Sequence, residues 1–555
     1  MEREFNLIDE PWICVRDKSC AVREVSLRDA LCRAHEYREL AGETKAQDVA
    51  VLRLLLAIVH TVFSRYDVDG EEIDRENMDE GEALDAAFEA WERIWREKRI
   101  PEKPVKKYFD KWHDRFWLFD EEHPFYQSNG ISGGDSGLFN TLKMIGSIIQ
   151  SNNSNRMFAD RKGDLVQTGY KGKINKKLER TIPLEYSEAA RWLIYIKCFD
   201  DKAIKPKASP TWESKLGLIY VEGNNLFETL MLNYVADADV DNGVYSSVPL
   251  WERDDVVDII NRLIPVPRAQ AELLTVKSRI MSLVRNHGHV IGFYDFSGDY
   301  FEEEQVFTEQ MTLWKCYDEG NIKRFRPLKY DPSLKAWQEF GSIAVSPIEA
   351  AENKNDKQKH MPGVIRWVKL LCGKNALDND YIIKAAIVAI IFDKKRSPAP
   401  PVRDILNDSI SFHSFLLTKL GKVWRSRIEE EIEKCAKAAG AVRFLSINLQ
   451  FACGASGDGI TGDDAKMSFY DQIDRPFRIW LAELDPEYGE EYTEKLEKEL
   501  SAIALRTGSD IASRAGGNAI FGRYVNGGKT VSSSAEALNI YVYQIRKIFN
   551  KAGDI

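Results

Sequence analysis

Cysteine is scarce in this chain, and the spacings that bind metal are missing. Eight cysteines are spread over 555 residues, with no C-x-x-C pair and no histidine at ligand spacing. We therefore expect buried, reduced thiols rather than a disulfide framework or a zinc site. No uncharged apolar run approaches the roughly 18 residues that cross a bilayer, and the first residues form no apolar signal segment. These absences predict a cytoplasmic protein with no membrane contact and no metal.

Catalytic signatures are also missing. No H-E-x-x-H, G-x-S-x-G or Walker pattern occurs, and the acidic residues form no recognisable acid/base pair or two-metal array. His287-Gly288-His289 is better explained as a turn, because two imidazoles alone make a poor metal site. The G-x-G-x-x-G match from Gly457 to Gly462 has no βαβ context and predicts only a loop between helices. The sequence thus predicts no catalytic residue and no cofactor.

Charge is distributed unevenly along the chain. The whole sequence has 77 Lys and Arg against 87 Asp and Glu, a formal net charge of −10. From Arg156 to Arg180, however, eight basic residues stand against three acidic ones, a local balance of +5. The basic residues of this window are Arg156, Arg161, Lys162, Lys171, Lys173, Lys176, Lys177 and Arg180. Such a stretch in an acidic protein indicates phosphate binding, and a solvated surface loop is the alternative.

The apolar patterns divide the chain into two domains. Residues 46–63 are apolar at nearly every turn and predict a buried helix, whereas residues 285–345 alternate as strands do. An apolar strand, a basic tip and a proline stop at 385–402 predict a hairpin. Four helical patterns follow, at about 411–439, 464–484, 490–514 and 533–549. We therefore predict an α+β fold, with a large mixed domain over 1–400 and a C-terminal four-helix bundle over 401–555.

The second of these helical patterns has the clearest buried face. Its apolar stripe comprises Phe469, Ile473, Phe477, Trp480 and Leu484. Residues three and four apart share one side of a helix, so we expect this stripe to face a core. Pro476 lies inside the pattern and is expected to kink the helix.

Three segments have the composition expected of a nucleic-acid contact. The first is the basic window, where Phe158 and Tyr170 lie among the cations. The second is the stretch ending in Lys215, Leu216 and Gly217, where glycine allows the backbone to approach a groove closely. The third is the hairpin tip, because a stiff hairpin can wedge between base pairs; an ordinary exposed turn is the alternative. The residues of the tip are Lys394, Lys395, Arg396 and Ser397.

Nine short motifs follow one another along residues 5–345. They are FNLIDEPWICV (5–15), EEHPFYQ (121–127), SNRMFADR (154–161), SEAARWLIYIKCFDD (187–201), GNNLFETLMLNY (223–234), VPLWERDD (248–255), VKSRIMSLV with HGHVIGFYDFSGD (276–299), MTLW (311–314) and RPLKYDPSLKAWQEF (326–340). In this order they resemble the CasA family, the large subunit of the type I-E CRISPR surveillance complex, Cascade. The motifs are structural in character rather than catalytic.

The resemblance implies a mixed N-terminal domain followed by a four-helix bundle, and a non-enzymatic role. Members of the family recognise the protospacer-adjacent motif in double-stranded DNA, mainly from the minor groove, and help to separate the strands beside it, which promotes R-loop formation in antiviral defence. The guide RNA recognises the rest of the target by base pairing. The expected partners are double-stranded target DNA, the guide RNA ribonucleoprotein with the other Cascade subunits, and a separate helicase-nuclease that the subunit recruits.

The resemblance also assigns roles to residues. The family's first loop corresponds to Asn155 to Asp164, with Phe158 at its aromatic position. Its glycine loop corresponds to Lys215, Leu216 and Gly217, where a single glycine replaces the usual pair, so the motif that is recognised stays open. The wedge hairpin corresponds to Asp393 to Ala399, where Lys-Lys-Arg-Ser replaces a Gln or Asn tip. The candidates in the first loop and basic window are Asn155, Arg156, Phe158, Arg161, Lys162, Lys171, Lys173, Lys176 and Lys177.

A nucleic-acid enzyme, such as a nuclease with an unrecognised site, is the alternative function. DNA cleavage by the isolated chain that EDTA abolishes would favour the enzyme. Co-elution of the chain with its co-expressed neighbours and a guide RNA would favour the binding subunit.

Overall fold

The computed structural model describes most of the chain, with gaps. The described residues are 3–74, 78–129, 138–141, 184–199, 217–236, 248–254, 258–259, 262–302, 306–319, 322–328, 334–344, 360–378, 380–392, 402–455, 459–525 and 530–549. The chain divides into two compact units, and each is described by itself. The first comprises Met1–Tyr330, Ser346–Leu370 and Ala385–Asp408, and the second Asp331–Val345, Leu371–Lys384 and Ser409–Ile555. The domain boundary near residue 400 stays a prediction.

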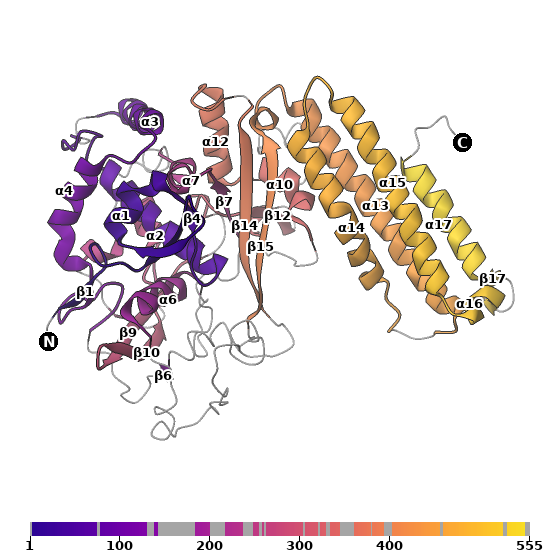
Figure 1. Ribbon diagram of the computed structural model, residues 1–555, viewed down its shortest axis with the longest axis horizontal. Coiled ribbons are helices and arrows are strands. Elements are labelled where there is room, and N and C mark those ends of the chain that lie inside the picture. Colours follow the sequence, from indigo (N-terminus) through magenta and orange to yellow (C-terminus); the bar gives the residue numbers. More distant parts are fainter. Residues whose placement is uncertain are drawn as a thin grey trace. The chain divides into compact units, whose positions relative to one another are not determined.

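The first unit mixes helices with several small sheets (Figure 1). Its helices are α1 (Leu27–Cys32), α2 (Lys45–Phe63), α3 (Glu80–Glu97), α4 (Glu102–Trp112), α6 (Tyr186–Phe199), α7 (Leu226–Asn233), α9 (Gln270–Leu274) and the start of α12 (Gly363–Gly373). Its strands are β1 (Glu4–Asn6), β2 (Ile13–Asp17), β3 (Val22–Val25), β4 (Tyr37–Leu40), β5 (Trp117–Phe119), β6 (Leu138–Thr141), β7 (Gly217–Glu222), β8 (Arg262–Leu263), β9 (Arg279–Asn286), β10 (His289–Ser297), β11 (Asp299–Tyr300), β12 (Trp314–Glu319), β13 (Ile322–Pro327) and most of β14 (Ile382–Phe392) and β15 (Val402–His413). The three-stranded sheets have the orders β3-β2-β4, β6-β10-β9 and β15-β14-β7. The prediction of a mixed helix and strand fold is confirmed.

Helix α2 is the core helix of the first unit. Thr44 caps its start, because the Thr44 side chain accepts a hydrogen bond from the Gln47 N–H at 3.1 Å. Every residue from Ala46 to Phe63 is buried, and the helix contacts α4, α6, α7 and α9. Among the described residues α2 is the one helix with the length and composition of a membrane span, but that stretch is wholly enclosed by the fold. The predicted buried helix at 46–63 is confirmed.

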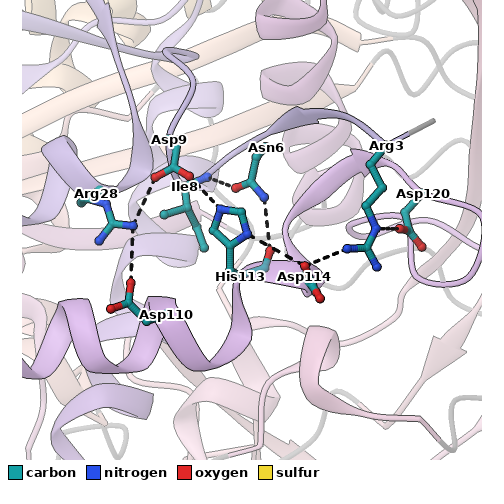
Figure 2. A network of polar contacts seen from close by, with 9 residues as sticks. All are labelled: Arg3, Asn6, Ile8, Asp9, Arg28, Asp110, His113, Asp114 and Asp120. Carbon is teal, nitrogen blue, oxygen red and sulfur yellow. Dashed lines mark hydrogen bonds and ion pairs between the residues drawn. The ribbon is translucent and has the colours of Figure 1, made fainter.

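A polar network fastens the first strand to the region after α4 (Figure 2). The ring of His113 shares a hydrogen bond of 2.7 Å with Asp9, and Arg28 donates to the same carboxylate at 3.2 Å. The Asn6 amide donates to the His113 carbonyl at 3.2 Å. Burial raises the pKa of Asp9, yet the bonds from His113 and Arg28 together lower it below its ordinary value. The remaining contacts between ionisable groups of the network are Arg3 with Asp114, Arg3 with Asp120, Arg28 with Asp110 and His113 with Asp114.

The His287-Gly288-His289 run closes the hairpin between β9 and β10. His287 and Gly288 have φ angles of +48° and +79°, as both central residues of a type I′ turn require. Asn286 pairs with His289 across the turn. The prediction of a turn is confirmed, and the His289 ring lies 3.0 Å from a Glu185 carboxylate oxygen.

Three sequence predictions need correction. Residues 336–344, expected to alternate as strands do, form a 3-10 turn and the helix α10 (Phe340–Ala344), whose apolar side chains are buried in the second unit. The helix expected over 411–439 spans 422–452 instead, because residues 411–413 continue β15 and Gly440 does not end the helix. Of the cysteines whose exposure the structure describes, only Cys372 and Cys435 are buried; Cys20 lies exposed in a turn and Cys453 at a helix end.

The second unit is built mainly from long helices (Figure 1). The described elements include α13 (Lys422–Ala452), α14 (Asp463–Glu483), α15 (Gly489–Arg514), α16 (Gly517–Phe521), α17 (Ser534–Phe549), β16 (Arg523–Val525) and β17 (Thr530–Ser532). Helix α13 contacts α14, α15 and α17, and α15 also contacts α14 and α17. The described residues of the Gly457 to Gly462 pattern lie between α13 and α14, as predicted.

The predicted stripe on α14 faces the core of the second unit. Phe469, Ile473, Phe477 and Leu484 are fully buried and Trp480 is 5% exposed, which confirms the stripe. Phe477 stacks on Trp337 with ring centroids 4.1 Å apart. The Trp337 indole N–H donates to Asp474 at 2.8 Å, so the residues before α10 dock on α14. The helix continues through Pro476.

Trp480→Ala tests the packing of α14. Removing a large buried ring leaves a cavity, so the free energy of unfolding should fall by about 3 to 5 kcal/mol. Urea unfolding of the full chain measures the loss. Ile479→Ala is the matched control on the same helix, because Ile479 is 44% exposed and its truncation should change stability little. Equal losses in the two variants would contradict the assignment of the buried face.

Asp48→Asn tests the electrostatics at the start of α2. Burial raises the pKa of Asp48 to about 6, despite the Lys45 ammonium and the Gly42 N–H, which favour the charged form. Between the ordinary pKa near 4 and about 6 the folded state holds a proton that the unfolded state has lost, so stability contributed by Asp48 falls as pH rises. The stability of Asp48→Asn relative to the parent should therefore rise by up to about 3 kcal/mol from pH 4 to pH 7.

Asp9→Asn is the control of opposite sign. The folded-state pKa of Asp9 is lowered, so its contribution is present above the unfolded pKa and disappears as pH falls. Denaturant titrations extended below pH 4 should therefore show a stability deficit of the Asp9→Asn variant that is level above the ordinary pKa near 4 and shrinks as pH falls below it. The difference for the Asp48→Asn variant becomes favourable between pH 4 and pH 7 instead. A pH-independent difference for Asp48→Asn would overturn the assignment.

Candidate nucleic-acid interface

Almost all of the predicted contact residues lie outside the described part of the chain. Gly217 is described and is the first residue of β7. The others stay predictions, and their positions can be bounded only by the elements that flank them. These are Asn155, Arg156, Phe158, Arg161, Lys162, Lys171, Lys173, Lys176, Lys177, Lys215, Leu216, Lys394, Lys395, Arg396 and Ser397.

Both ends of the segment that contains the basic window are fixed to one strand. Before it, β6 pairs with β10, and Thr141 lies opposite Gly292. After it, Leu184 forms an antiparallel bridge to Val290, with both N–H groups donating at 2.9 Å. Gly292 and Val290 are two residues apart on β10, which is about 7 Å along a strand. Thr141 and Leu184, the described residues on either side of 142–183, therefore pair with nearby positions of β10.

The helix that follows the window is held by a buried arginine. Arg191 of α6 donates to the Trp12 carbonyl at 2.7 Å and pairs with Glu43 at 2.8 Å and Glu24 at 2.6 Å. Its guanidinium thus joins α6 to the β3-β2-β4 sheet and to the start of α2. Such a charge is buried at little cost only when its donors are matched in this way. The return point of the segment is therefore rigid.

One sheet carries both of the other predicted segments. Residues 215 and 216 precede β7, and residues 393–401 join β14 to β15. In the sheet order β15-β14-β7, β7 is the hydrogen-bonded neighbour of β14 (Figure 1). Nearly 180 residues of sequence separate the two segments, so only the tertiary structure brings their supporting strands together.

The second edge of β7 is bonded to a turn that contains a buried ion pair. The Ile219 N–H donates to the Met311 carbonyl at 2.9 Å, and Leu218 forms an antiparallel bridge to Thr312. Within the turn, Glu309 accepts from the Met311 N–H at 2.9 Å and from the Thr312 hydroxyl. Arg53 of α2 donates to the other oxygen of Glu309 at 2.6 Å.

The C-terminal end of β7 is hydrogen-bonded to α7. The Asn233 amide accepts from the Val221 N–H at 2.9 Å and donates to the Val221 carbonyl at 2.7 Å, as a neighbouring strand would. Gly223 lets α7 approach, because a Cβ there would lie 2.3 Å from the Cβ of Glu228. The GNNLFETLMLNY motif therefore serves to lock β7 in place.

Helix α4 carries an exposed basic face that the sequence analysis missed. Lys103, Lys106, Lys107 and Lys111 are all exposed, and positions three and four apart share a helix face. Acidic residues offset part of this charge, with Lys103 paired to Glu71 at 3.0 Å. The signal is the spacing K-x-x-K-K-x-x-x-K between the buried apolar positions of the helix.

The described residues offer little for catalysis. No group of three or more His, Cys, Asp or Glu side chains in the described ranges is placed to hold a metal ion. The His113 and Asp9 pair lies among structural ion pairs at the edge of the first unit rather than beside a nucleophile (Figure 2).

The comparison with protein families decides the relationship. The family model described as CRISPR-associated protein Cse1 matches residues 6–507. The chain belongs to the Cse1 family. A CasA/Cse1 protein of Thermus thermophilus is 28% identical over 257 residues, which is 45% of this chain and 42% of that protein. The alignment thus spans less than half the length of this relative.

Solved structures show that the Cse1 fold extends over the whole chain. A crystal structure of Thermobifida fusca Cse1 matches with a TM-score of 0.77 at 23% identity, over 98% of both chains. That of Acidimicrobium ferrooxidans Cse1 matches with a TM-score of 0.72 at 20% identity, over 99% of this chain and 100% of the other. A chain of a structure titled CRISPR RNA-guided surveillance complex matches with a TM-score of 0.61 at 13% identity, over 98% and 100%. The resemblance inferred from the nine motifs is confirmed.

Replacing residues 142–183 by a short Gly/Ser linker tests the anchoring of the basic window. Thr141 and Leu184 meet neighbouring positions of β10, so the linker has only about 7 Å to span. We expect the variant to fold, with a melting temperature within a few degrees of the parent, because the cost of closing a loop changes slowly with its length. Circular dichroism and thermal melting measure this. Loss of cooperative melting would show that the segment is part of the core of the Cse1 fold.

Proposed function

We propose that the chain is the large subunit of a type I-E CRISPR surveillance complex, Cascade, and that it recognises the protospacer-adjacent motif in double-stranded target DNA. The observation that carries the proposal is the match of the Cse1 family over residues 6–507. The likeness to a chain of a CRISPR RNA-guided surveillance complex supports the assembly with a guide ribonucleoprotein. In this role the subunit is a non-catalytic, cytoplasmic binding protein, and the guide RNA supplies most of the sequence recognition.

The charge distribution supports DNA binding through particular segments. An acidic protein repels a duplex except where cations are gathered, and residues 156–180 have a balance of +5 within a chain of −10. Phosphate contacts of this kind release counterions, so affinity for duplex DNA should fall steeply with salt. The exposed lysines of α4 add cations on the described surface.

The supporting strands favour a division of labour between recognition and strand separation. Gly217 is the first residue of β7, and Lys215 and Leu216 directly precede it in the sequence; here the backbone would approach the groove. The tip Lys394, Lys395, Arg396 and Ser397 lies between β14 and β15, and it would act as a wedge beside the recognised motif. Because β7 and β14 are neighbours in one sheet, both segments would share a single rigid support.

The helices of the second unit complete the proposal. We assign α13, α14, α15 and α17 as the four-helix bundle expected from the sequence, given the contacts that each makes with its neighbours. Recruitment of a helicase-nuclease to the assembled complex is the further role proposed for the subunit.

The wedge is tested by replacing Lys394, Lys395 and Arg396 together with alanine. The variant should assemble normally with its partner subunits and guide RNA, but open a matched duplex about tenfold less readily, the equivalent of one stacked base step of about 1.4 kcal/mol. Permanganate footprinting follows strand opening, and size-exclusion chromatography follows assembly. The matched control removes the same charge from exposed residues of α15, as Lys495→Ala, Lys498→Ala and Arg506→Ala.

Equal opening by the tip variant and the control would remove the wedge role. DNA cleavage by the parent chain that requires a divalent metal would instead favour a nuclease.

A further inference from the structure

A buried polar cluster of three side chains lies directly beside β7. Arg53, Glu309 and Thr312 are 2%, 1% and 0% exposed. Arg53 donates to one oxygen of Glu309 at 2.6 Å, and the Thr312 hydroxyl and the Met311 N–H donate to the other. Both oxygens of the carboxylate are therefore occupied, which is the condition under which a buried charge is tolerated.

This cluster sets the conformation of the turn at residues 309–312, which is more than an ordinary packing contact does. Glu309 accepts hydrogen bonds from the backbone of Met311 and the side chain of Thr312, so its carboxylate closes residues 309–312 on themselves. Arg53 belongs to α2, the most enclosed helix of the first unit, and it holds the carboxylate from the side of the core. A shift of Glu309 would therefore require a shift of either the turn or α2.

The same turn is the backbone partner of the first residues of β7. Leu218 bridges to Thr312, and the Ile219 N–H donates to the Met311 carbonyl at 2.9 Å. Gly217 immediately precedes these two residues. Because β14 is also a neighbour of β7 in the sheet, β7 has a backbone partner other than this turn. The path of the chain at Gly217 is therefore set by the turn, and the turn is set by the Arg53 and Glu309 ion pair.

We propose that Arg53, Glu309 and Thr312 are positioning residues for recognition of the DNA motif. They act through the backbone of β7 on Gly217, the described residue of the proposed recognition segment, and do not themselves touch DNA. This inference rests on the proposed function and adds to it a buried determinant of specificity. Arg53 and Glu309, which form its ion pair, are 256 residues apart in the sequence. A loosened turn would leave the phosphate contacts in place but allow the recognising backbone to adopt several orientations in the groove. The preference for one flanking motif over another would then fall more than the overall affinity for DNA.

The test measures discrimination by the assembled complex. Thr312→Val keeps the side-chain shape and removes one hydrogen bond to Glu309, and Glu309→Gln keeps an acceptor but removes the charge that Arg53 neutralises. Wild-type complex is first incubated with guide-matched duplexes whose flanking base pairs are randomised, and the bound duplexes are sequenced. One duplex with a flank enriched in the bound fraction and one with a depleted flank are then used to measure two affinities for each variant. We expect each variant to narrow the ratio of the two affinities by about tenfold, with little change in assembly or in the salt dependence of binding.

Glu43→Gln is the matched control. Glu43 is the partner of Arg191 in the other buried arginine cluster of the first unit, which joins α6 to the β3-β2-β4 sheet and not to β7. Its removal should lower the melting temperature much as Glu309→Gln does, while the flank preference stays at the wild-type ratio. A general loss of stability would change the flank preference equally in Glu43→Gln and Glu309→Gln. A positioning role predicts a changed preference in Glu309→Gln alone.

The outcomes distinguish this inference from the proposed function. A wild-type complex without any flank preference overturns motif recognition by this subunit, and the positioning role with it. A wild-type preference that Thr312→Val and Glu309→Gln both retain overturns the positioning role alone. If Glu309→Gln fails to assemble, the milder Thr312→Val decides.

Discussion

The ion pair between Arg53 and Glu309 is the constraint on which the arrangement of the first unit depends. It joins the most enclosed helix, α2, to a turn that serves as the strand partner of β7. Taking two charges out of water costs several kcal/mol, which is offset only where every donor and acceptor is matched. At this site both oxygens of Glu309 are used, and the same bonds shape the turn that β7 needs. The geometry of the β15-β14-β7 sheet therefore follows from a polar contact as much as from apolar burial.

Two other polar contacts in the first unit also join elements that are far apart in the sequence. Arg191 holds α6 against Trp12, Glu24 and Glu43, and it does so just after the segment that contains the basic window returns to β10. The Asp9 and His113 network fastens the first turn of the chain to the end of α4 (Figure 2). In each case a polar contact joins described elements that are far apart in the sequence.

The second unit is stabilised differently, by apolar stripes on long helices. Phe469, Ile473, Phe477 and Trp480 lie on one face of α14, and Trp337 adds a stacked ring to it. Such an interface depends on helical periodicity, which is a local property of the sequence. Helical periodicity made several elements predictable: the stripe, the helices near 464–484, 490–514 and 533–549, and the buried helix at 46–63. The turn at His287 was predictable from its own local residues.

What the sequence determined by itself is the family, the local periodicity and the uneven charge, because each depends on residues that are close together in the chain. It placed the end of β15 and the start of α13 wrongly, since Ser411 to His413 suit either state and strand pairing with β14 decided between them. It also gave no sign that Arg53 meets Glu309, that Thr141 and Leu184 reach the same strand, or that β7 neighbours β14. These contacts join residues tens to hundreds of positions apart. Their partners are chosen by the closing of the whole fold, which no local pattern encodes, so only the tertiary structure decided them.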